Sequence, residues 1–212
     1  MKVKQTHLLL FLLIGCFYSA CQRTAAYLPY YSTPDFEPVW KPSKSAEIHS
    51  VPAFSLTNQN GKTVTDKSLE GKITIVNFIF TTCGGICPDM TKNLRTVLDT
   101  FTNDNEIRFQ SYSVKPWEDS VPRLKEFAAI YGITDTRWDL LTGDKAAIYT
   151  IARQGYFAEE DAGYNKDSTE FLHTENVVLI DKNKHIRGLY KGTLRLDMQH
   201  LITDIAILKK EP

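Results

Sequence analysis

The sequence predicts an α/β protein built as a three-layer sandwich, with helices on both faces of a central sheet. Two observations lead to this prediction. Short apolar runs that suit buried strands alternate with segments in which apolar residues recur at helical spacing. The chain then finishes with two strand-like runs around a turn, followed by one amphipathic helix. Such an alternation is typical of a sheet covered by helices on both faces.

The first half of the domain is expected to begin near Val51. Residues 51–72 alternate in polarity and turn at Asn60-Gly61, which predicts a β-hairpin. Residues 73–80, ITIVNFIF, are almost continuously apolar and predict a central strand buried on both faces. A loop with two cysteines follows, and then a predicted helix whose apolar positions are Met90, Leu94, Val97, Leu98 and Phe101.

The second half continues the alternation of strands and helices. In order, we expect a strand at 107–114, a helix at 124–131 that Gly132 ends, a strand at 138–141, a helix at 145–153, a polar loop at 159–169, a hairpin of strands 177–180 and 186–190, and a helix at 198–208. This order indicates a sandwich of the thioredoxin type with a terminal hairpin and helix.

Length and charge limit the organisation and the partners. The 212 residues suit one compact domain at 51–212, preceded by an extended, proline-rich linker at 22–50 and a signal or anchor at 1–21. Positive and negative side chains balance at 25 each, so no overall field would attract nucleic acid. We therefore expect no nucleic-acid partner.

The first residues predict export from the cytoplasm. Two lysines in MKVKQTH precede the apolar run LLLFLLIG, which is typical of a secretory signal. Cys16 and Cys21 each end a segment that resembles the lipobox of bacterial lipoproteins, and either is a candidate for lipidation. The alternative is an uncleaved anchor that extends to about Ala26. Both interpretations predict a membrane-anchored protein on the periplasmic side of the cell envelope.

Two cysteines, Cys83 and Cys87, remain for the globular part. The segment TTCGGICPDM places them where a helix starts, and Pro88 and Asp89 suit such a start. Unpaired N–H groups there lower a thiol pKa and favour the thiolate. The glycines between the cysteines allow the sulfurs to meet, either as a disulfide or around a soft metal ion. The spacing alone leaves redox chemistry, metal binding and structural accident open.

At this point the sequence resembles the Sco/SenC family over about residues 51–208. The resemblance lies in four stretches: NFIFTTCGGICPDM, SVKP at 113–116, WDLLTGD at 138–144 and FLHTENVVLID at 171–181. It implies a thioredoxin-fold copper protein that serves assembly of the CuA centre of cytochrome c oxidase. It also implies that Cys83, Cys87 and His173 bind a copper ion. Gly84 and Lys115 depart from the family, which usually has proline and aspartate there.

Three functions are therefore considered. The first is a copper metallochaperone that passes its ion to an oxidase subunit or another copper protein. The second is a thiol-disulfide oxidoreductase that keeps the cysteines of a target reduced, with Cys83 as the attacking thiol and an external thiol-disulfide reductant as partner. Peroxide reduction is disfavoured because TTCGGICPDM lacks the peroxidatic pattern. We expect no site role for His7, His49, His185 and His200.

Overall fold

A computed structural model describes residues 27–43, 46–158 and 174–211. Its strands are β1 (Tyr30–Tyr31), β2 (Pro38–Val39), β3 (Ser55–Asn58), β4 (Thr63–Thr65), β5 (Ile73–Ile79), β6 (Ile107–Ser113), β7 (Trp138–Thr142), β8 (Asn176–Ile180) and β9 (Ile186–Lys191). Its helices are α2 (Ile86–Thr100), α3 (Val121–Ile130), α4 (Lys145–Thr150) and α5 (Arg195–Leu208), with short helical turns η2 (Asp66–Leu69) and η3 (Ile151–Gly155). The described strands form one sheet in the order β2-β1-β9-β8-β5-β6-β7-β3-β4.

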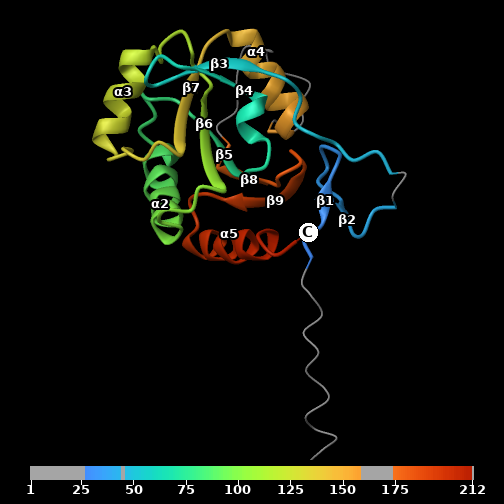
Figure 1. Cartoon of the computed structure of the whole chain (residues 1–212). Helices are drawn as coiled ribbons and strands as arrows, with labels where there is room; N and C mark the ends of the chain where they lie inside the picture. Colours follow the sequence, from blue (N-terminus) through green and yellow to red (C-terminus); the bar gives the residue numbers. More distant parts are fainter. Residues whose placement is uncertain (1–26, 44–45, 159–173, 212) are drawn as a thin grey trace, which may run out of the picture.

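Helices cover both faces of this sheet (Figure 1). β5, β6 and β7 run parallel, and right-handed crossovers place α2 and α3 on the same face. α5 packs beside α2. α4 and η3 lie on the other face, where the Tyr156 ring packs against the Phe78 and Tyr112 rings. The expected three-layer α/β sandwich of the thioredoxin type is confirmed.

The central strand β5 directs the chain to the cysteines. All its residues are buried, as its continuous apolar run predicts. β8 pairs antiparallel with β5, with Val177 opposite Asn77. Because the two strands run in opposite directions, β8 begins at the same end of the sheet at which β5 ends. The segment before β8 and the loop after β5 therefore converge.

The segment expected as an extended spacer contributes two strands to the sheet. β1 pairs with β2 and, through Tyr31 opposite Ile186, with β9. The Arg187 guanidinium, in a residue only 3% exposed, donates hydrogen bonds to the Leu28 carbonyl at 2.7 Å and the Pro29 carbonyl at 3.0 Å. This difference arises because the stabilising partner lies far along the sequence, where no local pattern reveals it.

The remaining expectations are confirmed, refined or located outside the described residues. The hairpin around Asn60-Gly61 is confirmed as β3 and β4. The helix expected at 145–153 is α4 continued by the π-helical turn η3. The signal segment with Cys16 and Cys21, the loop at 159–169 and His173 lie outside the described residues. In the part of the chain that is described, no helix has the length and apolar character needed to cross a bilayer.

Candidate metal centre

The two cysteines lie between the end of β5 and the first turn of α2. Cys87 is the second residue of α2 and is 3% exposed, whereas Cys83 lies in the preceding loop and is half-buried. The Cys83 N–H donates to the Phe80 carbonyl at 3.1 Å, which turns the chain after the strand. The thiols of Cys83 and Cys87 are hydrogen-bonded to each other. The expected meeting of the two sulfurs at the helix start is therefore present.

Their surroundings shift the two thiol pKa values in opposite directions. For Cys83, burial favours the neutral thiol, but hydrogen bonds from the Cys87 thiol and from the N–H groups of Cys87, Gly85 and Ile86 lower its pKa. For Cys87, burial and the hydrogen bond to Cys83 raise the pKa to about 12. The pair therefore consists of an accessible Cys83 that favours the thiolate and a buried Cys87 that retains its proton. A thiolate of this kind can attack a disulfide or bind a soft metal ion.

A buried carboxylate, Asp119, fixes the first part of the cysteine loop. It is completely buried and accepts hydrogen bonds from the Thr81 N–H at 3.2 Å, the Thr81 hydroxyl at 2.5 Å and the Ser113 hydroxyl at 2.6 Å. Thr81 leads into the cysteine loop, and Ser113 ends β6. Asp119 therefore joins two loops at the end of the sheet. Sequence reasoning missed it, because an acidic residue in the turn KPWEDSVP is also typical of a solvated loop.

Lys115, one of the two departures named from the resemblance, lies beside the same loop. Its ammonium is 4.8 Å from the centre of the Phe80 ring and 3.5 Å from a Glu118 carboxylate oxygen. The Glu118 carboxylate also accepts a hydrogen bond from the Thr82 hydroxyl at 3.2 Å. A positive side chain from the segment after β6 therefore lies close to the start of the cysteine loop.

The segment before β8 reaches the first turns of α2. The Glu175 carbonyl accepts a hydrogen bond from the Gly192 N–H at 2.7 Å. A Cβ built on Gly192 would be 3.1 Å from the Met90 side chain. Met90 follows Cys87 by three positions and thus lies on the same side of α2. The described chain resumes at Thr174, immediately after His173, near the start of α2.

The other histidines within the described residues have contacts elsewhere. The His49 ring nitrogen Nε2 is 3.0 Å from the Gly155 carbonyl, and the His185 ring nitrogen Nδ1 is 3.0 Å from the His49 carbonyl. His200 is exposed on α5. Among residues 27–43, 46–158 and 174–211, no three His, Cys, Asp or Glu side chains cluster as a metal site. The described part of the centre therefore consists of the two thiols.

Comparison with known proteins identifies the family. The SCO1/SenC family model matches residues 42–209. A SCO1 protein homolog of Bacillus subtilis is 30% identical over 159 residues, which cover 74% of this chain and 81% of the relative.

Solved structures show the same relationship. A SCO1/SenC family lipoprotein of Bacillus anthracis is 28% identical with a TM-score of 0.67, over 76% of this chain and 95% of its own. BsSco, in which a disulfide switch has been identified, is a member of the Sco family of cytochrome c oxidase assembly proteins. It is 29% identical with a TM-score of 0.66, over 80% of this chain and 98% of its own. ScoI of Arabidopsis thaliana with copper bound is 26% identical with a TM-score of 0.59, over 74% of this chain and 99% of its own. Because the family model matches most of the chain and the fold agrees with these solved structures, the chain belongs to the SCO1/SenC family.

Proposed function

We propose that this chain is a copper-binding metallochaperone that assists assembly of the CuA centre of cytochrome c oxidase. The observation that carries the proposal is the hydrogen-bonded thiol pair at the start of α2, in which the pKa of Cys83 is lowered. Soft thiolates select Cu(I) and also bind Cu(II) together with imidazole. Related proteins that bind copper or serve oxidase assembly support it.

Cys83, Cys87 and His173 are the proposed ligands. Two thiolates supply soft donors, and an imidazole is a suitable third ligand for copper. The convergence of the β8 start with the cysteine loop supports the choice of His173, which directly precedes the described residue Thr174. Copper is the cargo, and three ligands leave a coordination position through which an acceptor can exchange ligands.

Copper titration of the reduced full-length chain tests this proposal. One equivalent is expected to bind, and the Cu(II) form should show thiolate-to-copper absorption bands. Cys83→Ser and Cys87→Ser should each abolish tight binding, and His173→Ala should change the bands. His200→Ala, an exposed histidine on α5, is the matched control and should bind like the wild type. Unchanged bands in His173→Ala would remove that residue from the ligand set.

The opposite pKa shifts of the two thiols favour a second candidate, a thiol-disulfide oxidoreductase. The Cys83 thiolate would attack a target disulfide, forming a mixed disulfide and releasing one target thiol. Cys87, after losing its proton, would attack the Cys83 sulfur, forming the Cys83–Cys87 disulfide and releasing the second target thiol. A thiol-disulfide reductant then returns two electrons. The disulfide switch of BsSco supports this candidate.

Trapping of the mixed disulfide distinguishes a thiol-disulfide oxidoreductase from a protein that only binds copper. In Cys87→Ser the second attack cannot occur, so a target should remain bound to Cys83 and be released by dithiothreitol. Cys83→Ser is the control and should trap nothing. A target trapped equally well by both variants would contradict the assigned order of attack.

We also propose that the chain is a lipoprotein of the cell envelope, anchored through Cys16 or Cys21, with an oxidase subunit as the copper acceptor. The lipobox-like segments and the related lipoprotein support this location. Metabolic labelling with a fatty acid tests it in Cys16→Ser and Cys21→Ser. Loss of label in one variant identifies the lipidated cysteine, and label in neither wild type nor variants favours the uncleaved anchor.

A further inference from the structure

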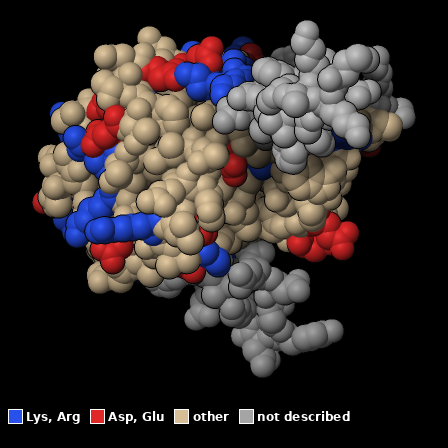
Figure 2. All heavy atoms as spheres, turned by 90° about the horizontal axis from the view of Figure 1, so that it is seen from below, with Lys and Arg blue, Asp and Glu red and all other residues tan. Residues whose placement is uncertain are grey.

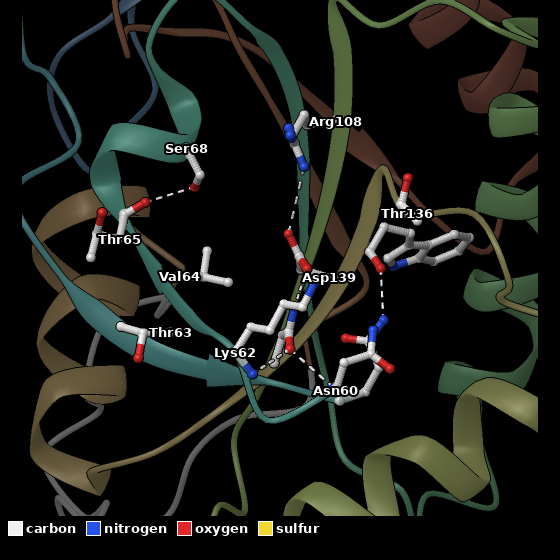
Figure 3. A pocket seen from close by; sticks show the side chains of 12 residues that line it. Asn60, Lys62, Thr63, Val64, Thr65, Ser68, Arg108, Thr136 and Asp139 are labelled. Carbon is white, nitrogen blue, oxygen red and sulfur yellow. Dashed lines mark hydrogen bonds and ion pairs between the residues drawn. The ribbon is translucent and has the colours of Figure 1, made fainter.

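A polar pocket lies at the end of the sheet opposite to the cysteine loop. Its volume is about 330 Å³, within the range of small-molecule sites. The β3–β4 hairpin and η2 form one wall, and the first residues of β6 and β7 form the other (Figure 3). The cysteine loop follows the last residue of β5. Because β5, β6 and β7 are parallel, the pocket and the thiols lie at opposite ends of these strands.

Two cations and one carboxylate face this pocket. Arg108 and Asp139 point toward each other, and Lys62 reaches in from the hairpin turn (Figure 3). The guanidinium of Arg108 forms an ion pair with the Asp139 carboxylate at 3.9 Å, a separation too long for a hydrogen bond. The carboxylate instead accepts a hydrogen bond from the Asn58 amide at 2.7 Å. The pocket therefore has one more positive than negative group.

The donors of both cations remain available to a ligand. Within the described ranges, neither the Arg108 guanidinium nor the Lys62 ammonium has a hydrogen-bond acceptor in the protein. Burial raises the pKa of Asp139 even though Asn58, Arg108 and Lys62 all favour its charged form. A bound anion would therefore share Arg108 with Asp139, whereas Lys62 has no ion pair among the described residues.

The turn that presents Lys62 is held rigidly. The Asn58 side-chain oxygen accepts hydrogen bonds from the N–H groups of Asn60 and Lys62, both at 3.0 Å. The Gln59 amide donates to the Trp138 carbonyl at 2.9 Å and accepts from the Leu140 N–H at 2.8 Å. These contacts join the turn to β7, so the position of the Lys62 backbone is fixed before any ligand binds.

Hydroxyl groups line the facing wall. Thr65 and Ser68 lie across the pocket from Arg108, and Thr63 and Thr136 complete the polar lining (Figure 3). The Ser68 hydroxyl donates to the Thr65 carbonyl at 2.7 Å and accepts from Gln110 at 2.9 Å. Each wall therefore offers one cation and at least one hydroxyl, Lys62 with Thr63 and Thr65 on the hairpin side and Arg108 with Thr136 on the other, which suits an anion with several oxygen atoms.

We propose that this pocket binds a phosphate group, either as inorganic phosphate or on a small metabolite. The planar guanidinium of Arg108 matches two phosphate oxygens, and the ammonium of Lys62 supplies a second positive charge. The hydroxyls of Thr63, Thr65 and Thr136 are the donors for the remaining oxygens, because the Ser68 hydroxyl already donates to the Thr65 carbonyl. The site is independent of the copper centre at the other end of the sheet.

Isothermal titration calorimetry of the full-length chain, in a phosphate-free buffer of low ionic strength, tests the proposal. Inorganic phosphate and glycerol 3-phosphate are the two ligands, and the one that binds more tightly identifies the source of the phosphate group. Saturable binding of one equivalent is expected. Arg108→Gln should weaken it by about tenfold or more, because it removes a charged hydrogen-bond donor.

Matched variants make the result decisive. Lys62→Gln, on an exposed turn, should also weaken binding and tests the site even if Arg108→Gln disturbs the fold. Lys67→Gln changes the same charge on η2 outside the pocket and should bind like the wild type. No saturable binding of either ligand, or equal binding by Lys62→Gln and Lys67→Gln, overturns the proposal. Copper titration of Lys62→Gln should be unchanged, so this result stands apart from that of the proposed function.

Discussion

Cys83 and Cys87 show how position changes the chemistry of one residue type. Cys83 lies just before α2, is partly accessible and has its pKa lowered. Cys87 lies in the first turn of α2, is buried among apolar side chains and has its pKa raised. The sequence predicted the pair and its helix start from the motif itself. It could not predict the structural role of Asp119. A carboxylate in a turn stabilises the fold only where the fold brings hydrogen-bond donors to it, and Thr81 and Ser113 lie far from Asp119 or in another element.

The pH dependence of alkylation follows from these shifts. Iodoacetamide reacts with the thiolate, so Cys83 should react at a lower pH than an ordinary thiol, while Cys87 stays unmodified well above neutrality. Cys87→Ala removes a hydrogen bond to the Cys83 thiolate. The pKa of Cys83 should therefore rise, and the alkylation profile should move to higher pH.

Cys87→Ser is the control for this measurement, because its hydroxyl can still donate to Cys83. Its profile should lie between those of the wild type and Cys87→Ala. Mass spectrometry of the alkylated peptides reports each site. Faster modification of Cys87 than of Cys83 at neutral pH would contradict the described asymmetry.

Removal of Asp119 should destabilise the loop that carries Cys83. Asp119→Ala leaves the Thr81 N–H, the Thr81 hydroxyl and the Ser113 hydroxyl without their acceptor. We expect the free energy of unfolding to fall by about 3 kcal/mol, measured by urea denaturation. Glu118→Ala, which removes a neighbouring exposed carboxylate, should change it by less than about 1 kcal/mol. Equal effects of the two variants would show that Asp119 has no special role.

Among the strands and helices, those that are specified by their own residues could be predicted from the sequence, and those that depend on distant contacts could not. β5 was predicted to within one residue because burial on both faces requires a continuous apolar run. β1 and β2 have only two residues each and are stabilised by Arg187 from β9, so no period marks them. The π-helical turn η3 was missed because its apolar spacing differs little from that of the α-helix it continues.

The junction between β9, β8 and α2 should be sensitive to one added methyl group. In Gly192→Ala the new Cβ would be 2.9 Å from a Val177 methyl and 3.2 Å from the Glu175 carbonyl. We expect a loss of about 1–3 kcal/mol in the free energy of unfolding and weaker copper binding, because the segment next to His173 must shift.

Gly84→Ala is the control for stability at that junction. A Cβ on Gly84 would meet no atom within 4 Å, so its free energy of unfolding should change by less than about 0.5 kcal/mol. Denaturation and copper titration of both variants provide the comparison. If Gly192→Ala bound copper as tightly as the wild type, the expected effect of this junction on the metal centre would be contradicted.

At the scale of the whole molecule, a buried ion-pair network joins the two ends of the described chain. The Arg187 guanidinium contacts Asp181 at 3.0 Å and Glu211 at 2.8 Å, and the Glu211 carboxylate accepts a hydrogen bond from the Leu28 N–H at 2.9 Å. Figure 1 places β1 beside the C-terminal end of the chain. Figure 2 shows acidic and basic side chains mixed over the visible face, in agreement with balanced charges of 25 and 25.

Arg187→Ala should release the segment 27–43 from the sheet. The buried Asp181 and the partly buried Glu211 would both lose their cationic partner, so we expect a loss of about 3–5 kcal/mol in the free energy of unfolding. Limited proteolysis should cut within 27–43 sooner than in the wild type. Lys182→Ala, which breaks an exposed pair with Glu106, should leave the cleavage rate unchanged. Equal protease resistance of Arg187→Ala and wild type would contradict the role given to Arg187.

The placement of β1 at the margin of the sheet has a mechanical consequence. A pull on the chain ahead of β1 would reach β9 through the contacts between these two strands, and β8 stands between β9 and the strand that ends at the thiols. The thiols therefore lie three strands away from β1 in the sheet. A load on the chain ahead of β1 would thus enter the sheet at a distance from the reactive sulfurs.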